Sequence, residues 1–141
     1  MRKDDHFLQY LQQVPMFQAC SKKDLLTIGR LADDVKVDPG QILVKEGARG
    51  EEFFIITEGT ATVSRAGQKV ATLEPGDYFG ELALLDPAPR DATVTADTAL
   101  EVLVLGKREF SGLLAEIPTI SHKLMVGMAR RLHEADNKTL R

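Results

Sequence analysis

The chain has 141 residues, the length of one domain, and 43% of them are hydrophobic, which is enough to bury a core. The 18 basic and 21 acidic residues leave a net charge of -3, so no protein-wide field attracts nucleic acid or an anionic membrane. Cys20 is the single cysteine, which excludes an internal disulfide and a multi-cysteine metal site and fits a cytoplasmic location, and no apolar stretch approaches membrane-spanning length.

Residues 1–34 have the apolar spacing of helices. In the stretch that ends at Pro15, apolar residues recur at helical intervals. Ser21 followed by Asp24 is typical of a helix N-cap with an acid in the first turn. This second helix is expected to end near Arg30 or Asp33.

Residues 35–106 have the pattern of a strand-rich scaffold, in which short β-branched runs alternate with turns such as Asp38-Pro39-Gly40 and Glu58-Gly59. The predicted strands are Val35–Val37, Ile42–Val44, Phe53–Ile56, Ala61–Val63, Val70–Leu73, Ala92–Thr95 and Leu100–Leu105. Many short strands at regular spacing indicate a barrel or a jelly roll. One helical turn, Leu82–Leu85, interrupts this rhythm, and such an interruption is where function is expected.

Residues 107–141 return to helical spacing. One helix is predicted from Lys107 to Leu114, and another begins at Pro118. Its apolar stripe consists of Ile120, Leu124, Met125, Met128 and Leu132. The stripe is expected to pack on the barrel, and it could also pair with a second copy or with an effector domain. Because no repeat or low-complexity linker occurs, residues 1–141 are predicted to form a single domain.

The most informative segment runs from Phe79 to Val94. Gly80 lets the backbone come close to another group, and the apolar turn after it has free N–H groups that favour an anion. Two prolines stop that turn, after which Arg90 can return to the same place as a permanently charged donor. With Glu81 able to accept from a hydroxyl, the segment suits a small phosphate that carries a hydroxyl-bearing group.

The same residues also have structural interpretations. Arg90 could be a surface arginine after a proline turn, and Glu81 could be a first-turn acid that stabilises its helix. His6, His122 and His133 lie outside the strand zone, which argues against a metal-dependent jelly-roll enzyme. No serine or cysteine stands with a histidine in a pattern that indicates a nucleophile pair. Neither a metal site nor an enzyme is therefore expected.

The order of residues in the segment resembles the cyclic nucleotide-binding domain family, which includes bacterial cyclic-AMP receptor proteins, kinase regulatory subunits and nucleotide-gated channels. The phosphate-binding cassette of that family reads Phe-Gly-Glu-(Leu/Ile)-Ala-Leu, a few variable residues, then Pro-Arg-x-Ala-(Thr/Ser)-Val. Residues 79–94 match this cassette in full, and the glycines at 40, 47, 59 and 76 are also similar. The resemblance implies a mainly β fold, an eight-stranded antiparallel β-roll (jelly-roll) barrel with N-terminal helices, a short phosphate-binding helix and C-terminal helices.

By position, the resemblance also implies a role for each cassette residue. Arg90 would bind the cyclic phosphate together with the backbone N–H groups of Ala83 and Ala92, and Glu81, beside Gly80, would accept from the ribose 2′-hydroxyl. The other implied ligand contacts are Phe79, Leu82, Asp91 and Thr93 in the cassette, Val63 and Val70 on the base side, and Arg131 and Leu132 as candidates to cap the base from the last helix.

The expected ligand is cAMP, and no cofactor is expected beside it. Asp91 follows the cassette arginine at a position where threonine is associated with a preference for cGMP, and the missing threonine favours cAMP. The Asp91 carboxylate could accept from an exocyclic amine of either purine or stay a solvated charge, so a cGMP-preferring module stays open. A degenerate domain used for protein–protein interaction is the other alternative.

The resemblance implies a regulatory module in which ligand binding moves the flanking helices. Receptor proteins of the family that bind DNA add a helix-turn-helix domain after the long helix. Residues 132–141 are too few for such a domain, so no nucleic-acid partner is expected.

Overall fold

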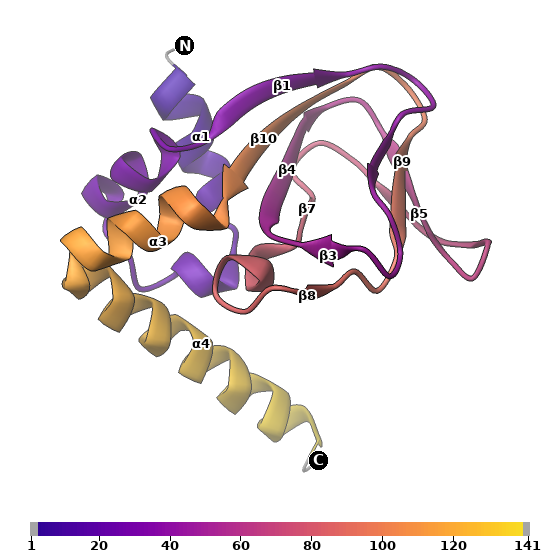
Figure 1. Ribbon diagram of the computed structural model, residues 1–141. Helices are drawn as coiled ribbons and strands as arrows, with labels where there is room; N and C mark the ends of the chain where they lie inside the picture. The colour runs from indigo at the N-terminus through magenta and orange to yellow at the C-terminus, as the bar shows by residue number, and fades with distance from the viewer. Residues whose placement is uncertain (1–2, 140–141) are drawn as a thin grey trace. The chain divides into compact units, whose positions relative to one another are not determined.

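The glycine-punctuated middle of the chain forms strands, and the segments before and after it form helices (Figure 1). The computed structural model describes residues 3–139. Its backbone contacts divide the chain into two compact units. The strand unit is Ala32–Glu109, and the helical unit contains the residues up to Leu31 and those from Phe110 onward.

The strand unit consists of antiparallel pairs in two four-stranded sheets and one two-stranded ribbon among the described residues. The sheet orders are β1-β10-β4-β7 and β2-β9-β5-β6, and the ribbon is β3-β8. The strands are β1 (Asp33–Val37), β2 (Ile42–Val44), β3 (Arg49–Gly50), β4 (Glu52–Glu58), β5 (Ala61–Arg65), β6 (Gln68–Leu73), β7 (Tyr78–Phe79), β8 (Ala88–Pro89), β9 (Thr93–Ala96) and β10 (Leu100–Gly106). The predicted mainly β, antiparallel class is confirmed.

The described residues form ten strands, where the β-roll of the resemblance has eight. All seven runs that the sequence predicts as strands are present, with ends shifted by at most two residues. The additional strands are β3, β7 and β8, each of two residues. A two-residue strand has no periodicity of its own, so only its pairing partner reveals it.

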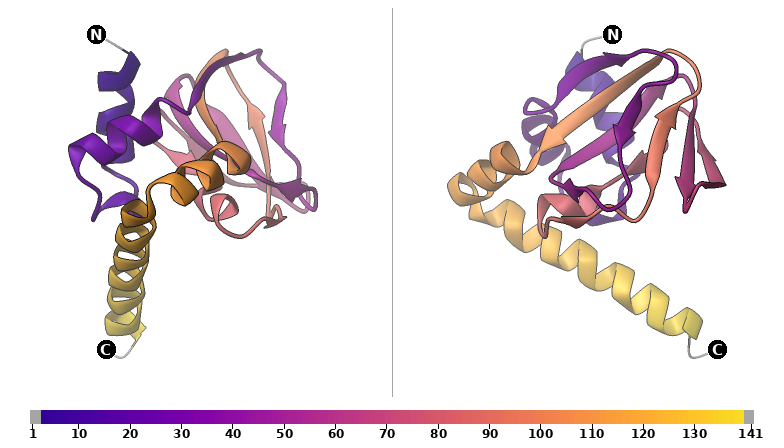
Figure 2. Two further views of the ribbon diagram at one scale, coloured as in Figure 1. Left: turned by 60° about the vertical axis from the view of Figure 1, so that its left-hand side comes forward. Right: turned by 45° about the vertical axis from the view of Figure 1, so that its right-hand side comes forward.

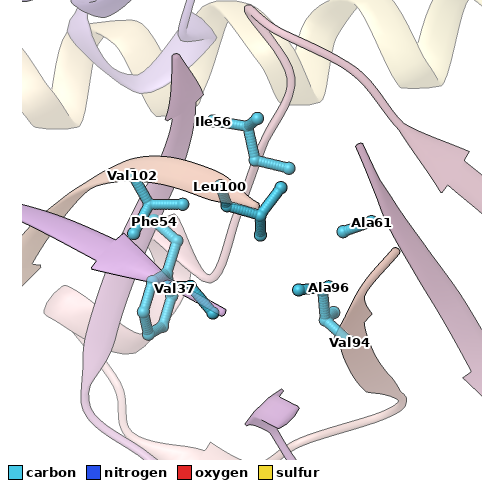
Figure 3. Packing of buried hydrophobic residues seen from close by; sticks show 8 residues of the cluster. All are labelled: Val37, Phe54, Ile56, Ala61, Val94, Ala96, Leu100 and Val102. Atoms are coloured by element: carbon cyan, nitrogen blue, oxygen red, sulfur yellow. The ribbon is translucent and has the colours of Figure 1, made fainter. Parts of the chain in front are cut away.

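The interior of the strand unit is lined by apolar side chains from both sheets (Figure 3). The cluster consists of Val37, Phe54, Ile56, Ala61, Val94, Ala96, Leu100 and Val102. Burying a large side chain of this kind contributes about 1.5–3 kcal/mol. In β9 the buried residues alternate with half-buried threonines, because successive side chains of a strand point to opposite faces.

The turn between β4 and β5 shows why glycine separates the strands. Gly59 has φ +86°, a conformation that favours glycine. A Cβ at this position would collide with the Ala99 carbonyl oxygen and lie 2.8 Å from Leu100 Cδ2. The glycine therefore allows both the turn and the close approach of the chain before β10.

The helical unit contains α1 (Lys3–Leu11), η1 (Pro15–Phe17), α2 (Lys22–Gly29), most of α3 (Lys107–Glu116) and α4 (Pro118–Thr139). Ser21 caps α2 as predicted. Its hydroxyl accepts from the Asp24 N–H at 3.1 Å, and the Asp24 carboxylate accepts from the Ser21 N–H at 2.9 Å. The 3-10 helix η1 has no counterpart in the prediction, which expects only a break at Pro15.

Within the helical unit, α4 packs closely on η1. Gly127 makes this approach possible, since a Cβ there would lie 2.7 Å from the Met16 carbonyl oxygen. Lys123 Nζ also lies 2.6 Å from Asp24 Oδ2, an ion pair that joins α4 to the start of α2. Figure 2 shows α4 as one unbroken helix. None of the described helices combines the length and the apolar character needed to cross a bilayer.

Candidate functional site

The turn at Gly80 brings the start of the cassette beside Glu52 and Arg90. Gly80 has φ +83° and precedes η2 (Glu81–Leu84), a 3-10 helix. A Cβ at Gly80 would be strained and would lie 2.5 Å from Arg90 Nη1 and 2.6 Å from the Glu52 carbonyl oxygen. The helical turn predicted at Leu82–Leu85 is thus present, begins one residue earlier, and depends on this glycine.

The backbone of Arg90 is fixed by the loop after β2. The Arg90 N–H donates to the Ala48 carbonyl oxygen at 2.8 Å, and the Arg90 carbonyl oxygen accepts from the Gly47 N–H at 2.8 Å. The β3–β8 ribbon pairs directly beside these bonds. Both backbone polar groups of Arg90 are therefore satisfied, and only its side chain is available for a ligand.

The Arg90 side chain lies in a narrow slot above an aromatic pair. Its Nη2 donates to the Glu52 carbonyl oxygen at 2.8 Å, and its Cζ is 5.9 Å from the centroid of the Phe54 ring. Phe79 stacks on Phe54 with 4.9 Å between ring centroids and 14° between ring planes. A Cβ at Gly50 would overlap the guanidinium. We call Gly50, the Glu52 carbonyl, Phe54 and Gly80 the Arg90 slot.

The electrostatics of the slot favour an added anion. Desolvation by burial lowers the pKa of Arg90 from its usual value, and the Glu52 carboxylate opposes this shift. The guanidinium still stays protonated at neutral pH and carries five N–H donors. Among the described residues it forms no ion pair, and its hydrogen bond goes to a neutral carbonyl. A half-buried cation with unused donors is suited to a phosphate.

Three residues of η2, Glu81, Leu82 and Ala83, are among the predicted ligand contacts. Glu81 is half-buried at the first position of η2, and Leu82 is 48% exposed. Ala83 is buried, and its N–H donates to the Gly80 carbonyl oxygen at 3.0 Å within the 3-10 turn. If a phosphate binds here, the Ala83 N–H would be shared between the phosphate and the Gly80 carbonyl oxygen. The hydroxyl-binding role of Glu81 stays a prediction.

The two predicted base-side valines differ in their surroundings. Val63 is half-buried on β5, opposite Val94 of β9, and packs against the apolar cluster of the strand unit. Val70 is 54% exposed and lies at a bulge, because the β5–β6 register passes from Ala71 to Lys69 without pairing it. Val63 is therefore the better placed of the two to face a ligand inside the roll.

The residues after Arg90 are held by two residues that are not among the predicted site residues, Arg65 through its side chain and Glu46 through its backbone N–H. The exposed Asp91 accepts through its carbonyl oxygen from Arg65 Nε at 3.1 Å. Thr93 begins β9, and its Oγ1 accepts from the Glu46 N–H at 2.9 Å. Ala92, between them, is half-buried. Arg65 and Glu46 thus fix the end of the cassette.

Two predicted residues belong to the other unit. Arg131 and Leu132 lie on α4, both are exposed, and Leu132 is 64% exposed. They are part of the helical unit, whereas the cassette is part of the strand unit. Their role as base caps stays a prediction.

Of the residues that surround the Arg90 side chain, Gly80 was predicted from the sequence, whereas Gly50, Glu52 and Phe54 were not. Gly50 and Arg90 are far apart in sequence, and no local pattern relates them. The β3–β8 pairing brings them together, and this pairing is not visible in the sequence.

A model of the family described as "Cyclic nucleotide-binding domain" matches residues 34–116. The chain belongs to this family. The match covers the whole cassette and the strands that form the Arg90 slot. Family membership and slot geometry therefore point to the same segment.

Relatives and solved structures agree with this assignment. The chain is 39% identical over 115 residues to the "cAMP-dependent protein kinase regulatory subunit" of Yarrowia lipolytica, a match that covers 80% of this chain and 30% of the relative. A relative of the same description from Eremothecium gossypii is 40% identical over 109 residues, covering 77% of this chain and 24% of the relative. The chain thus spans less than a third of the length of these relatives.

Among solved structures, the N-terminal domain of a transcriptional regulator from Streptomyces coelicolor A3(2) superposes with a TM-score of 0.84 at 29% identity, covering 91% of this chain and 95% of that one. The regulatory domain of Toxoplasma gondii PKA with cAMP superposes with a TM-score of 0.69 at 34% identity, covering 77% of this chain and 43% of that one. The fold of the chain is thus that of cyclic nucleotide-binding domains.

Proposed function

We propose that this chain is a non-enzymatic regulatory module that binds cAMP. The observation that carries the proposal is the half-buried Arg90 guanidinium, which forms no ion pair among the described residues. Hydrogen bonds to charged groups contribute about 1.5–3 kcal/mol each, so each bond from the Arg90 guanidinium to an anion would add binding free energy of this size. Similarity to regulatory subunits of cAMP-dependent protein kinase, and to a structure solved with cAMP, supports cAMP as this anion.

In the proposed complex the cyclic phosphate lies on Arg90, which the slot holds in place before the ligand arrives. Glu81, at the start of η2, accepts from the ribose 2′-hydroxyl, and Val63 faces the base. Because the net charge of the chain is -3, attraction of the anionic ligand has to come from this local site.

The proposed preference for cAMP over cGMP rests on the residue after Arg90. Asp91 occupies the position where threonine is associated with cGMP, and its carboxylate is exposed. An exposed carboxylate beside a bound phosphate weakens binding by charge repulsion. A hydrogen bond that the carboxylate accepts from the base would offset this cost. Side-by-side titration with the two nucleotides decides this question.

Regulation is proposed to pass through the helices. Arg131 and Leu132 of α4 are the proposed base caps, so the ligand would bind better to the conformation in which α4 covers the base. An effector or a second copy of the chain could then bind the exposed apolar residues of α4, Met125 and Leu132. The cytoplasmic location and the single-domain organisation of residues 1–141 stay predictions.

Calorimetric titration with cAMP, cGMP and 5′-AMP tests the proposal. The protein should bind cAMP most tightly, and 5′-AMP, whose phosphate is not cyclic, should bind weakly. Arg90→Ala is expected to weaken cAMP binding about 10- to 100-fold, the value of one charge-assisted hydrogen bond. Arg108→Ala, an exposed arginine of α3, is the matched control and should bind as the wild type does.

Two results would contradict the proposal. One is the absence of both heat and a melting shift with either cyclic nucleotide while the fold is intact. The other is unchanged cAMP affinity in Arg90→Ala, which would make the cassette a scaffold for protein–protein interaction.

A further inference from the structure

The tip of the β5–β6 hairpin extends beyond the sheet that carries it. The pairing of β5 with β9 runs from Ala61 to Ser64. Arg65 and the turn residues Ala66 and Gly67 lie past the end of this ladder. Since β6 is the edge strand of its sheet, the position of the tip depends on other contacts.

Glu46 supplies one of these contacts. Its Oε1 accepts from the Ala66 N–H at 2.9 Å. Ala66 has φ +53° and Gly67 has φ +78°, the two successive left-handed residues of a tight hairpin turn. Alanine adopts this conformation at a cost, and a charged acceptor on its N–H stabilises it. The Glu46 carboxylate thus fixes the shape and the place of the tip.

Glu46 is joined to the cassette as well. Its own N–H donates to Thr93 Oγ1 at 2.9 Å, and the N–H of the next residue, Gly47, donates to the Arg90 carbonyl oxygen at 2.8 Å. From the hairpin, Arg65 Nε donates to the Asp91 carbonyl oxygen at 3.1 Å. These bonds form a closed ring between the hairpin tip and the segment that holds Arg90.

We propose that Glu46 is a positioning residue of the nucleotide site. It sets the spacing between β5, whose Val63 faces the base, and the segment that places Arg90 on the phosphate. The inference rests on the proposed function, because the spacing matters only to a ligand that spans both sides. Glu46 acts through Ala66 and Thr93 and does not touch the ligand itself.

A pair of variants separates the reach of Glu46 from its charge. Glu46→Asp keeps the charge but is one methylene shorter, so it loses the bond to Ala66. Glu46→Gln keeps the reach, since its amide oxygen can accept from the same N–H. Glu58→Asp, at the exposed end of β4, is the matched control for shortening a carboxylate.

Each variant is titrated calorimetrically with cAMP and with ribose 3′,5′-cyclic phosphate, which has no base. Glu46→Asp is expected to bind cAMP about tenfold more weakly and the base-free ligand as the wild type does, because only cAMP needs the spacing. Glu46→Gln and Glu58→Asp should retain the wild-type ratio of the two affinities. Hydrogen exchange of the Ala66 amide without ligand should speed up in Glu46→Asp only.

Equal weakening of both ligands by Glu46→Asp, or unchanged cAMP binding, would overturn the inference and leave the proposed function in place. Protection of the Ala66 amide equal to that of the wild type would overturn it too. If the wild-type protein binds no cyclic nucleotide, the proposed function fails and the inference fails with it.

Discussion

Replacing Gly50 with alanine moves the Arg90 side chain without changing any charge. Gly50 lies outside the left-handed region, so its backbone accepts alanine. The added Cβ would overlap the guanidinium of Arg90, which must then leave the slot. Because the three atoms nearest to that Cβ all belong to the Arg90 side chain, the change should affect the phosphate contact selectively.

The size of the effect follows from what Arg90 would lose. Its hydrogen bond to the Glu52 carbonyl, at 2.8 Å, holds the guanidinium where the phosphate is proposed to bind. Loss of one charge-assisted bond to the phosphate costs about 1.5–3 kcal/mol. Gly50→Ala should therefore weaken cAMP binding about 10- to 100-fold, close to the effect of Arg90→Ala.

The assay is a double-mutant cycle by calorimetry. Gly50→Ala, Arg90→Ala and the double variant are titrated with cAMP, and in the Arg90→Ala background the second change should cost almost nothing. Gly112→Ala is the matched control, because its Cβ would meet no atom within 4 Å on α3. This control should leave affinity unchanged and raise the free energy of unfolding by up to about 1 kcal/mol.

Two results would refute the reasoning about the slot. Wild-type affinity in a folded Gly50→Ala protein would mean that the guanidinium does not need this position. Equal weakening by Gly50→Ala with and without Arg90 would mean that the alanine acts through some other part of the site.

Three further predictions concern separate parts of the molecule. Glu81→Gln should weaken cAMP about tenfold but leave 2′-deoxy-cAMP unaffected, and equal losses would contradict the ribose role. Burial and the nearby Asp24 raise the pKa of the Cys20 thiol from 9.0 to about 11, so iodoacetamide alkylation should have its pH midpoint near 11. Because the thiol ionises at lower pH in the unfolded chain than in the folded protein, the free energy of unfolding should fall as pH rises from 9.0 to about 11. An alkylation midpoint near 9.0 would disprove the pKa shift. In Gly127→Ala the new Cβ would lie 2.7 Å from the Met16 carbonyl oxygen, so the free energy of unfolding measured in urea should fall by about 1–3 kcal/mol. An unchanged free energy of unfolding would contradict the close packing of α4 on η1.

The elements with strong local signals could be predicted from the sequence. The capping box of Ser21 and Asp24 fixes the start of α2, and the β-branched runs fix the long strands, because these signals depend on neighbouring residues only. The structure adds η1 and the two-residue strands β3, β7 and β8. Their short segments form only because a partner from elsewhere in the chain is present.

The candidate site also contains both residues that local sequence predicts and residues whose placement depends on the tertiary structure. Gly80, Glu81 and Arg90 stand in one cassette, so their order alone pointed to an anion site. Val70, predicted with Val63 as a base-side residue from the resemblance, lies exposed at a bulge, and the register shift that places it there depends on how β5 pairs with β6. Strand register is a property of two segments together.

The sequence by itself determined the class of the fold, the cassette and the cation that an anionic ligand requires, since these depend on residue type and local order. The tertiary structure decided how that cation is held. Gly50, Glu52 and Phe54 surround Arg90 because β3 pairs with β8 and β4 pairs with β7. These pairings are favourable only when the interior of the roll is buried, so no short stretch of sequence contains them.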